Sequence, residues 1–597
     1  MATRIDSPAH RAPGPHRHRA APDGSAPSRL ALLWALAAVA LTGALGAAAL
    51  FRPGRAGEGA LAANGFLLVH TGTVPGVPAL SPDGVAALHL ALYAPLTGGF
   101  ARDDALLSVG RELLLVAALL SACLIWRVAS RLGLGHGAAA VAVVLASLPL
   151  LFSGTALLDV PAQLAVPWGL AAAWAATADR RILRALLGLP ALAVAALLAP
   201  PVLVPALAGA AMATFPTGLA RRHPVRTALA IGLAAAAGLV LWRLAAGGLG
   251  AETALPAADP GVLGPAGLRA AAVAFLLVGM LAAWLLSAFR VPAITLVAGG
   301  LAALLPLDRL TILVVCLPLA AVLVAALSGR LSDELTARGQ RGGMRGLQVG
   351  AAVALVALAG VAGARLTREP ARMPAARGPA ELLHWIRGEL PQGTPVLAPS
   401  VVWAELVRAG ADEKQLRLPG ATAGPQVQIV LGTIPPGTLV LSRVPGSGRP
   451  PLLVLDRRRG VPTAGELARR QALAAALLAN PTTVAGPRAT TVLRAATVDE
   501  RLLTVLAALG AQFGVSVHDL PPAPGQPPGG LTRYALVDRL GGEPVTPGAS
   551  TTARLTNWLG AQLPPFRPDS VQVTGDGVLI GFQYVSAPDE LVSRAAP

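Results

Sequence analysis

Long apolar runs separated by short polar links make up most of the chain from Leu30 to Leu366. The first run, Leu30–Phe51, contains no charged residue and is bounded by Arg29 and Arg52. A stretch of about 20 apolar residues is long enough to cross a bilayer as a helix. The pattern therefore predicts a membrane helix here, preceded by a basic and disordered tail over residues 1–28, which is rich in Pro, Arg and His.

Ten further apolar runs follow, so that about eleven transmembrane helices are expected over residues 29–366. Between the first two runs, the amphipathic Leu61–His70 and the short apolar Val85–Tyr93 are expected to lie on the outer interface, with their apolar sides against lipid. The ninth run is short and weak, and a re-entrant segment there would change the parity of the count. The ten runs are Arg111–Ser130, Gly137–Phe152, Val160–Ala176, Ala185–Ala199, Val202–Phe215, Thr227–Ala246, Leu268–Phe289, Ile294–Leu305, Leu310–Leu327 and Leu347–Ala364.

Arginine-rich links follow every second helix, on the side of the N-terminal tail. Basic loops stay in the cytoplasm, so we expect a multi-pass protein of the plasma membrane with a cytoplasmic N-terminus and an extracytoplasmic C-terminal region. A net charge of +17 would suggest nucleic acid in a soluble protein, but this distribution explains it, and no nucleic-acid partner is expected. Cys123 and Cys316 both lie inside apolar runs and are expected to be core residues.

Beyond Thr367 the apolar runs shorten to the length of strands and alternate with helical stretches. This alternation is typical of a layered α/β fold. The expected fold class is a polytopic α-helical membrane protein with a C-terminal extracytoplasmic α/β domain. Its expected parts are the tail 1–28, the membrane domain 29–366, an outer α/β domain 367–520, and a small α+β lobe 521–597 after the Pro/Gly-rich linker Pro521–Gly530.

Two acidic residues lie just outside predicted membrane helices, where ionisable groups are often functional. Glu58 follows the first helix and Asp159 lies between the third and the fourth, so both are expected on the outer face. Two carboxylates can supply a general base together with a metal or substrate ligand. Alternatively, Glu58 is a solvated loop residue and Asp159 is the N-cap of the fourth helix.

The order of these segments resembles that of the GT-C membrane glycosyltransferases, especially the branch of protein O-mannosyltransferases and aminoarabinose transferases. That family has an acidic pair after the first helix, then a helical segment ending in Thr-Gly, which correspond here to Gly57-Glu58 and to the stretch closing in His70-Thr71-Gly72. An outer segment containing proline, an arginine at the second helix (Arg111) and an outer aspartate before the fourth (Asp159) follow in the same order. The resemblance covers about the first 200 residues, and one carboxylate of the acidic pair is replaced by Gly57.

The resemblance implies transfer of a sugar from a polyprenyl-phosphate donor, held in membrane lipid, to an extracytoplasmic acceptor, either an envelope glycan or a protein. Glu58 and Asp159 would be the catalytic residues, and Arg111, Arg309 and His70 would bind substrate. No cofactor is implied with certainty, although a divalent cation is compatible with the acidic residues. Two alternatives remain open, namely an inactive relative whose outer domain binds envelope polymer or a partner protein, and a transporter.

Overall fold

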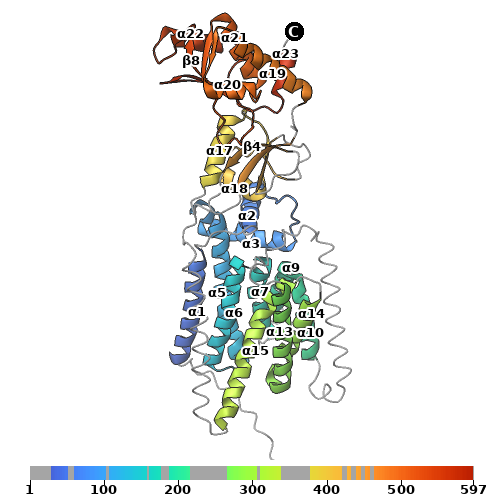
Figure 1. Ribbon diagram of the computed structural model, residues 1–597. Coiled ribbons are helices and arrows are strands. Elements are labelled where there is room, and N and C mark those ends of the chain that lie inside the picture. The colour runs from blue at the N-terminus through green and yellow to red at the C-terminus, as the bar shows by residue number, and fades with distance from the viewer. Residues whose placement is uncertain are drawn as a thin grey trace, which may run out of the picture.

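The computed structural model describes residues 29–50, 59–102, 106–156, 160–176, 187–214, 265–305, 309–337, 377–419, 427–431, 438–444, 451–457 and 463–595. A helical bundle forms one end of the molecule, and two mixed helix and sheet lobes are stacked beyond it, with the C-terminus at the far end (Figure 1). The helices of the bundle are α1 (Arg29–Leu50), α5 (Leu106–Arg131), α6 (His136–Ala156), α7 (Val160–Ala176), α9 (Leu189–Leu198), α10 (Leu203–Thr214), α13 (Pro265–Leu285), α14 (Arg290–Leu304) and α15 (Arg309–Ala337).

Four helical segments within the described residues are long and apolar enough to cross a membrane: Leu106–Arg131, Ala266–Leu285, Ser287–Leu304 and Arg309–Leu331. This finding supports the expected membrane class, while the count of eleven crossings stays a prediction. The seventh and eleventh expected helices, Thr227–Ala246 and Leu347–Ala364, lie outside the described residues.

The ninth expected helix is longer than its apolar run suggested. A short 3₁₀ turn, Ser287–Phe289, leads directly into α14, and together they give 18 residues. Pro292 lies in the first turn of α14, where a missing N–H costs nothing, so the helix can begin before Ile294. Small residues then allow close packing, because a Cβ at Gly299 would overlap the sulfur of Cys316 on α15. Cys316 is buried as expected, whereas Cys123 is exposed on α5.

Two shorter helices lie between the bundle and the first lobe (Figure 1). In α2 (Gly59–Thr71) every residue from Ala60 to Leu67 is buried, because α2 packs against α3, α5 and α18 of the outer lobe. Its apolar side is therefore covered by protein rather than by lipid, unlike the expectation for Leu61–His70. In α3 (Pro82–Thr97) the N-cap hydroxyl of Ser81 accepts a hydrogen bond from the Gly84 amide, and the helix ends at Gly98.

The first lobe contains a five-stranded sheet with the order β2-β1-β3-β5-β4. The strands β2, β1 and β3 are parallel, and β5 and β4 are antiparallel to their neighbours. Because α18 starts directly after β1, the chain crosses from the sheet to the top of α2 within a few residues. The elements are α17 (Arg377–Glu389), β1 (Val396–Leu397), α18 (Ser400–Arg408), β2 (Leu416–Arg417), β3 (Val427–Leu431), β4 (Leu439–Val444) and β5 (Leu452–Asp456).

The second lobe contains a sheet with the order β10-β11-β8-β7-β6, and β9 pairs with β8. It joins strands from both sides of Pro521–Gly530, so the boundary between the two sheets falls between Asp456 and Ala464 rather than at Pro521. The elements are α19 (Ala464–Ala479), β6 (Thr483–Ala485), α20 (Pro487–Arg494), α21 (Glu500–Gln512), β7 (Val515–Asp519), β8 (Tyr534–Leu540), β9 (Glu543–Pro544), α22 (Ser550–Gly560), β10 (Ser570–Thr574), β11 (Gly577–Gly581) and α23 (Pro588–Ala595).

A buried polar junction holds the two lobes together. The carboxylate of Glu389, at the end of α17, accepts hydrogen bonds from Arg533 and Tyr534 of the second lobe, both at 2.8 Å. The Tyr584 hydroxyl donates to the carboxylate of Asp456 in the first lobe. These groups have little access to water, so removing one partner would leave a buried charge or acceptor unpaired.

Candidate functional site

Both expected catalytic residues, Glu58 and Asp159, lie outside the described residues, but the chain on either side of them is placed. Leu61, close behind Glu58, and Val160, directly after Asp159, belong to one buried apolar cluster together with Leu113 of α5. The structure thus brings the flanks of the two acidic positions to the same end of the bundle, beneath the first outer lobe (Figure 1).

Arg111 lies at this end of the bundle and is only 5% exposed. Its guanidinium donates a hydrogen bond of 3.2 Å to the carbonyl oxygen of Leu50, the last residue of α1. Carbonyl groups at a helix C-terminus lack partners within the helix and carry partial negative charge, so an arginine there satisfies and stabilises them. Arg111 therefore fixes the point at which the chain leaves α1 towards Glu58.

A further carboxylate, that of Glu112, follows Arg111 in α5 and was not singled out from the sequence. Its Oε2 atom accepts hydrogen bonds from Arg102 at 2.6 Å and from the Tyr93 hydroxyl at 3.3 Å. These partners come from α3 and from the short segment that follows it, so the ion pair ties the outer segment to α5. The signal that could have revealed it is the acidic residue near the start of a membrane helix.

His89 of α3 and Trp168 of α7 form another polar contact across this end of the bundle. The indole N–H of Trp168 donates to His89 Nε2 at 3.0 Å, and His89 Nδ1 lies 2.7 Å from the Val85 carbonyl oxygen. These partners assign the ring proton to Nδ1, because Nε2 acts as acceptor. The contact fixes α3 against the helix that begins directly after Asp159.

Of the two other residues expected to bind substrate, Arg309 lies at the same end of the bundle as Val160, whereas His70 lies at the far end of α2 from Gly59. Arg309 opens α15, whose Val314 clusters with Ala162 and Val166 of α7, so it lies at the same end of the bundle as Val160. Its Nε donates to the Leu305 carbonyl oxygen at 3.3 Å.

His70 is exposed near the end of α2, stacked on Phe66 with ring centroids 3.9 Å apart. At 1.5 Å per residue, His70 lies about 16 Å along α2 from Gly59. It is therefore distant from the residue that directly follows Glu58.

Asp83 adds a further acidic group on the outer segment, in the first turn of α3. Burial raises the pKa of its carboxyl group, because a charged carboxylate is poorly solvated there. Among the described residues, no group of three or more His, Cys, Asp or Glu side chains could hold a metal ion. No protein-family model matches the sequence, and a search of curated proteins finds no similar sequence.

Proposed function

We propose that this protein is a membrane glycosyltransferase that moves a sugar from a polyprenyl-phosphate donor to an extracytoplasmic acceptor of the cell envelope. The observation that carries the proposal is that α2 and α7, which begin directly after Glu58 and Asp159, both pack against α5. The proposal includes about eleven crossings, a cytoplasmic N-terminus and extracytoplasmic outer lobes, in agreement with the arginine-rich links on one side.

In the proposed reaction, Glu58 takes the proton of the acceptor hydroxyl as its oxygen attacks the anomeric carbon. The bond from that carbon to the phosphate oxygen breaks, and polyprenyl phosphate leaves with the electron pair. Asp159 orients the acceptor or the sugar. Arg111 and Arg309 lie at the end of the bundle beneath the first outer lobe. In the proposed reaction their positive charge stabilises the departing phosphate.

The exposed side of α3 suits a donor that stays in the bilayer. Leu88, Leu92 and Leu96 recur every four residues and are 46%, 62% and 87% exposed. Residues four apart lie on one face of a helix, so these leucines form an apolar stripe beside the proposed site. A polyprenyl chain can pass along such a stripe without leaving lipid.

The test is transfer of radiolabelled sugar from polyprenyl-phosphate donors in membranes that contain the full-length protein. Glu58→Gln should lower the rate by roughly 10²–10⁴-fold, the usual effect of losing a general base. Glu413→Gln, which changes an exposed carboxylate of the first lobe, should leave transfer unchanged. Transfer that survives Glu58→Gln at the wild-type rate would refute the assignment of the base.

Two observations favour a second candidate, a non-catalytic relative that binds envelope polymer. The position before Glu58 is Gly57, and the nearby carboxylate of Glu112 is engaged by Arg102 and Tyr93. In that case no donor supports transfer by the wild-type protein, while polymer binding by the outer lobes is retained.

A further inference from the structure

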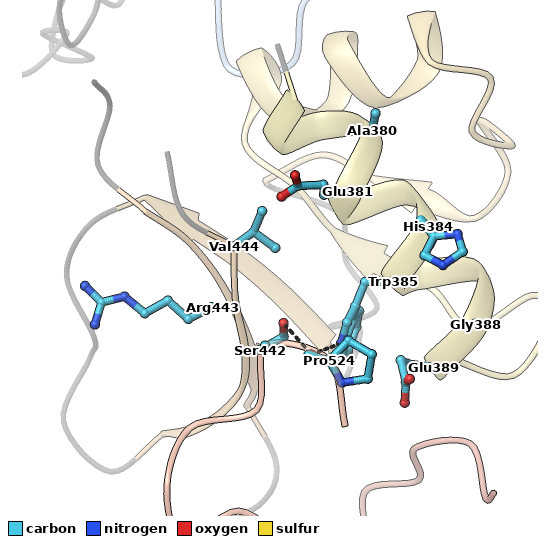
Figure 2. Close-up of a pocket in the computed structure, with 11 residues that line it drawn as sticks. Ala380, Glu381, His384, Trp385, Gly388, Glu389, Ser442, Arg443, Val444 and Pro524 are labelled. Atoms are coloured by element: carbon cyan, nitrogen blue, oxygen red, sulfur yellow. Dashed lines mark hydrogen bonds between the residues drawn. The ribbon is translucent and has the colours of Figure 1, made fainter. Parts of the chain in front are cut away.

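A cleft of about 520 Å³ lies in the first outer lobe, between α17 and strand β4. One wall of the cleft is formed by Glu381, His384, Trp385 and Gly388 of α17. Their spacing of three and four residues places them on one face of the helix. The indole of Trp385 extends from this wall to the floor of the cleft, where its N–H donates to the Pro524 carbonyl oxygen at 3.1 Å (Figure 2).

Gly388 keeps this cleft open. Glycine inside a helix costs about 0.5–1 kcal/mol relative to alanine. Apart from the neighbouring residues and backbone of α17 itself, no atom of the described residues lies within 4 Å of the position that a Cβ would take at Gly388, so close packing does not require the glycine. Gly388 does not have a positive φ, so a left-handed backbone conformation does not require glycine here either. The missing side chain leaves open space beside this part of α17.

The floor of the cleft is a strap formed by Pro524 and Gly525. The amide of Arg443 on β4 donates to the Gly525 carbonyl oxygen at 2.9 Å, and the Ser442 hydroxyl donates to that of Pro524 at 3.3 Å. Gly525 has a φ of +70°, and a Cβ there would overlap the Ser442 hydroxyl. Since the strap occupies the hydrogen-bonding edge of β4 at this point, an extended peptide cannot add to the sheet there.

The polar groups that face the cleft are acidic or neutral. Glu381 points across it towards Val444, whereas the guanidinium of Arg443 points away (Figure 2). Neither Glu381 nor His384 makes a side-chain hydrogen bond or ion pair with another residue of the described ranges. The charge of Glu389 is already paired with Arg533. A polyanionic ligand would meet like charge, while hydroxyl groups could donate to the Glu381 carboxylate.

We propose that this cleft binds one strand of a neutral glycan, whose C–H faces rest on Pro524 and Val444 and whose hydroxyl groups bond to Glu381 and His384. Ligand sites of this size are mostly apolar with a few convergent polar groups, as here. The inference rests on the proposed function in one respect, that the strand is the acceptor of the transferred sugar.

The test measures binding of neutral hexasaccharides of α-linked mannose, glucose, galactose and arabinose to the full-length protein in nanodiscs, by saturation-transfer NMR and calorimetry. At least one should bind, and both Gly388→Trp, which fills the cleft, and Glu381→Ala should weaken it about tenfold or more. The exposed control Glu413→Ala should bind like the wild type. Circular dichroism of each variant checks that the lobe is folded.

Three outcomes would overturn the proposal: no hexasaccharide binds, binding is unaffected by Gly388→Trp, or polyglutamate or a lysine-rich peptide binds in the cleft in place of the glycans. Transfer to a short alkyl glycoside separates this inference from the proposed function. If that transfer depends on Glu58 while no hexasaccharide binds, the cleft inference alone fails. If a hexasaccharide binds in the cleft while no donor supports transfer, the proposed function alone fails.

Discussion

Two carboxylates, Glu500 and Asp589, share a buried site in the second lobe, where the last helix, α23, packs against α21. Arg470 pairs with both oxygens of Asp589, and the Arg470 side chain is 1% exposed. Glu500 is left with Arg469 at 3.7 Å, and its Oε2 atom is buried without a hydrogen-bond partner among the described residues. Burial, together with the neighbouring Asp589 carboxylate, which favours the protonated form of Glu500, raises the pKa of Glu500 to about 7.

The direction of the pH effect follows from this raised pKa. The folded protein holds the Glu500 proton more tightly than the unfolded chain, so ionisation of Glu500 opposes folding. The penalty is absent below about pH 4.5, grows as the pH rises, and is complete above about pH 7. Raising the pKa from 4.5 to about 7 corresponds to a penalty of about 3 kcal/mol, which is an upper limit for the loosening of α23.

We therefore expect Glu500→Gln to protect α23 at pH 8.5 and to change it little at pH 5, because glutamine is neutral and can donate to Asp589. Hydrogen exchange of the full-length protein in detergent, corrected for intrinsic rates, measures the opening of Pro588–Ala595. Up to about 300-fold more protection at pH 8.5 would match a pKa raised from 4.5 to about 7. Glu590→Gln on the exposed side of α23 is the matched control. Equal pH dependence in the wild type and in Glu500→Gln would refute the reasoning.

Three further predictions follow from other contacts. Glu389→Gln should lower the free energy of unfolding of the outer lobes by about 3–5 kcal/mol in denaturant titrations, since it leaves Arg533 buried without its carboxylate; retained stability would contradict this. Gly59→Ala should reduce sugar transfer and Val401→Ala should restore it in the double variant, because a Cβ at Gly59 would lie 3.1 Å from the Val401 side chain; additive losses would exclude this coupling. A reporter fused at Pro597 should be extracytoplasmic, and a cytoplasmic signal would overturn the odd number of crossings.

The local elements of the outer lobes could be predicted because their signals are local. Beyond Thr367 the expected alternation of helical stretches and strand-length apolar runs is found, for example in α17 (Arg377–Glu389) and β3 (Val427–Leu431). The division into lobes could not be predicted, because β6 pairs with β7 in parallel and the sheet then continues into β8 beyond a Pro/Gly-rich segment. Glycine and proline mark a break in the regular elements, but not a break between cores.

The contacts of α2 and the presence of the cleft could not be predicted from the sequence, for a different reason. An apolar residue such as Phe66 satisfies lipid and a protein core equally well, so the pattern of Leu61–His70 could not reveal that α18 covers it. The cleft brings together α17, β4 and Pro524, which are far apart in the chain. Arg111 was singled out because the resemblance places an arginine at the start of the second helix, whereas its bond to Leu50 requires the fold.

Within the described residues, packed helices connect the regions of the two proposed sites. Gly59, adjacent to the proposed base, lies against Val401 at the start of α18, and α18 packs beside α17, which forms a wall of the cleft. The strap of Pro524 and Gly525 is hydrogen-bonded to β4, and Glu389 pairs with Arg533 of the second lobe. A glycan strand held in the cleft would therefore keep a fixed position relative to α2, which begins directly after Glu58. Such an arrangement lets binding energy gained in the outer lobe position a hydroxyl group at the membrane surface, which is how remote contacts contribute to catalysis.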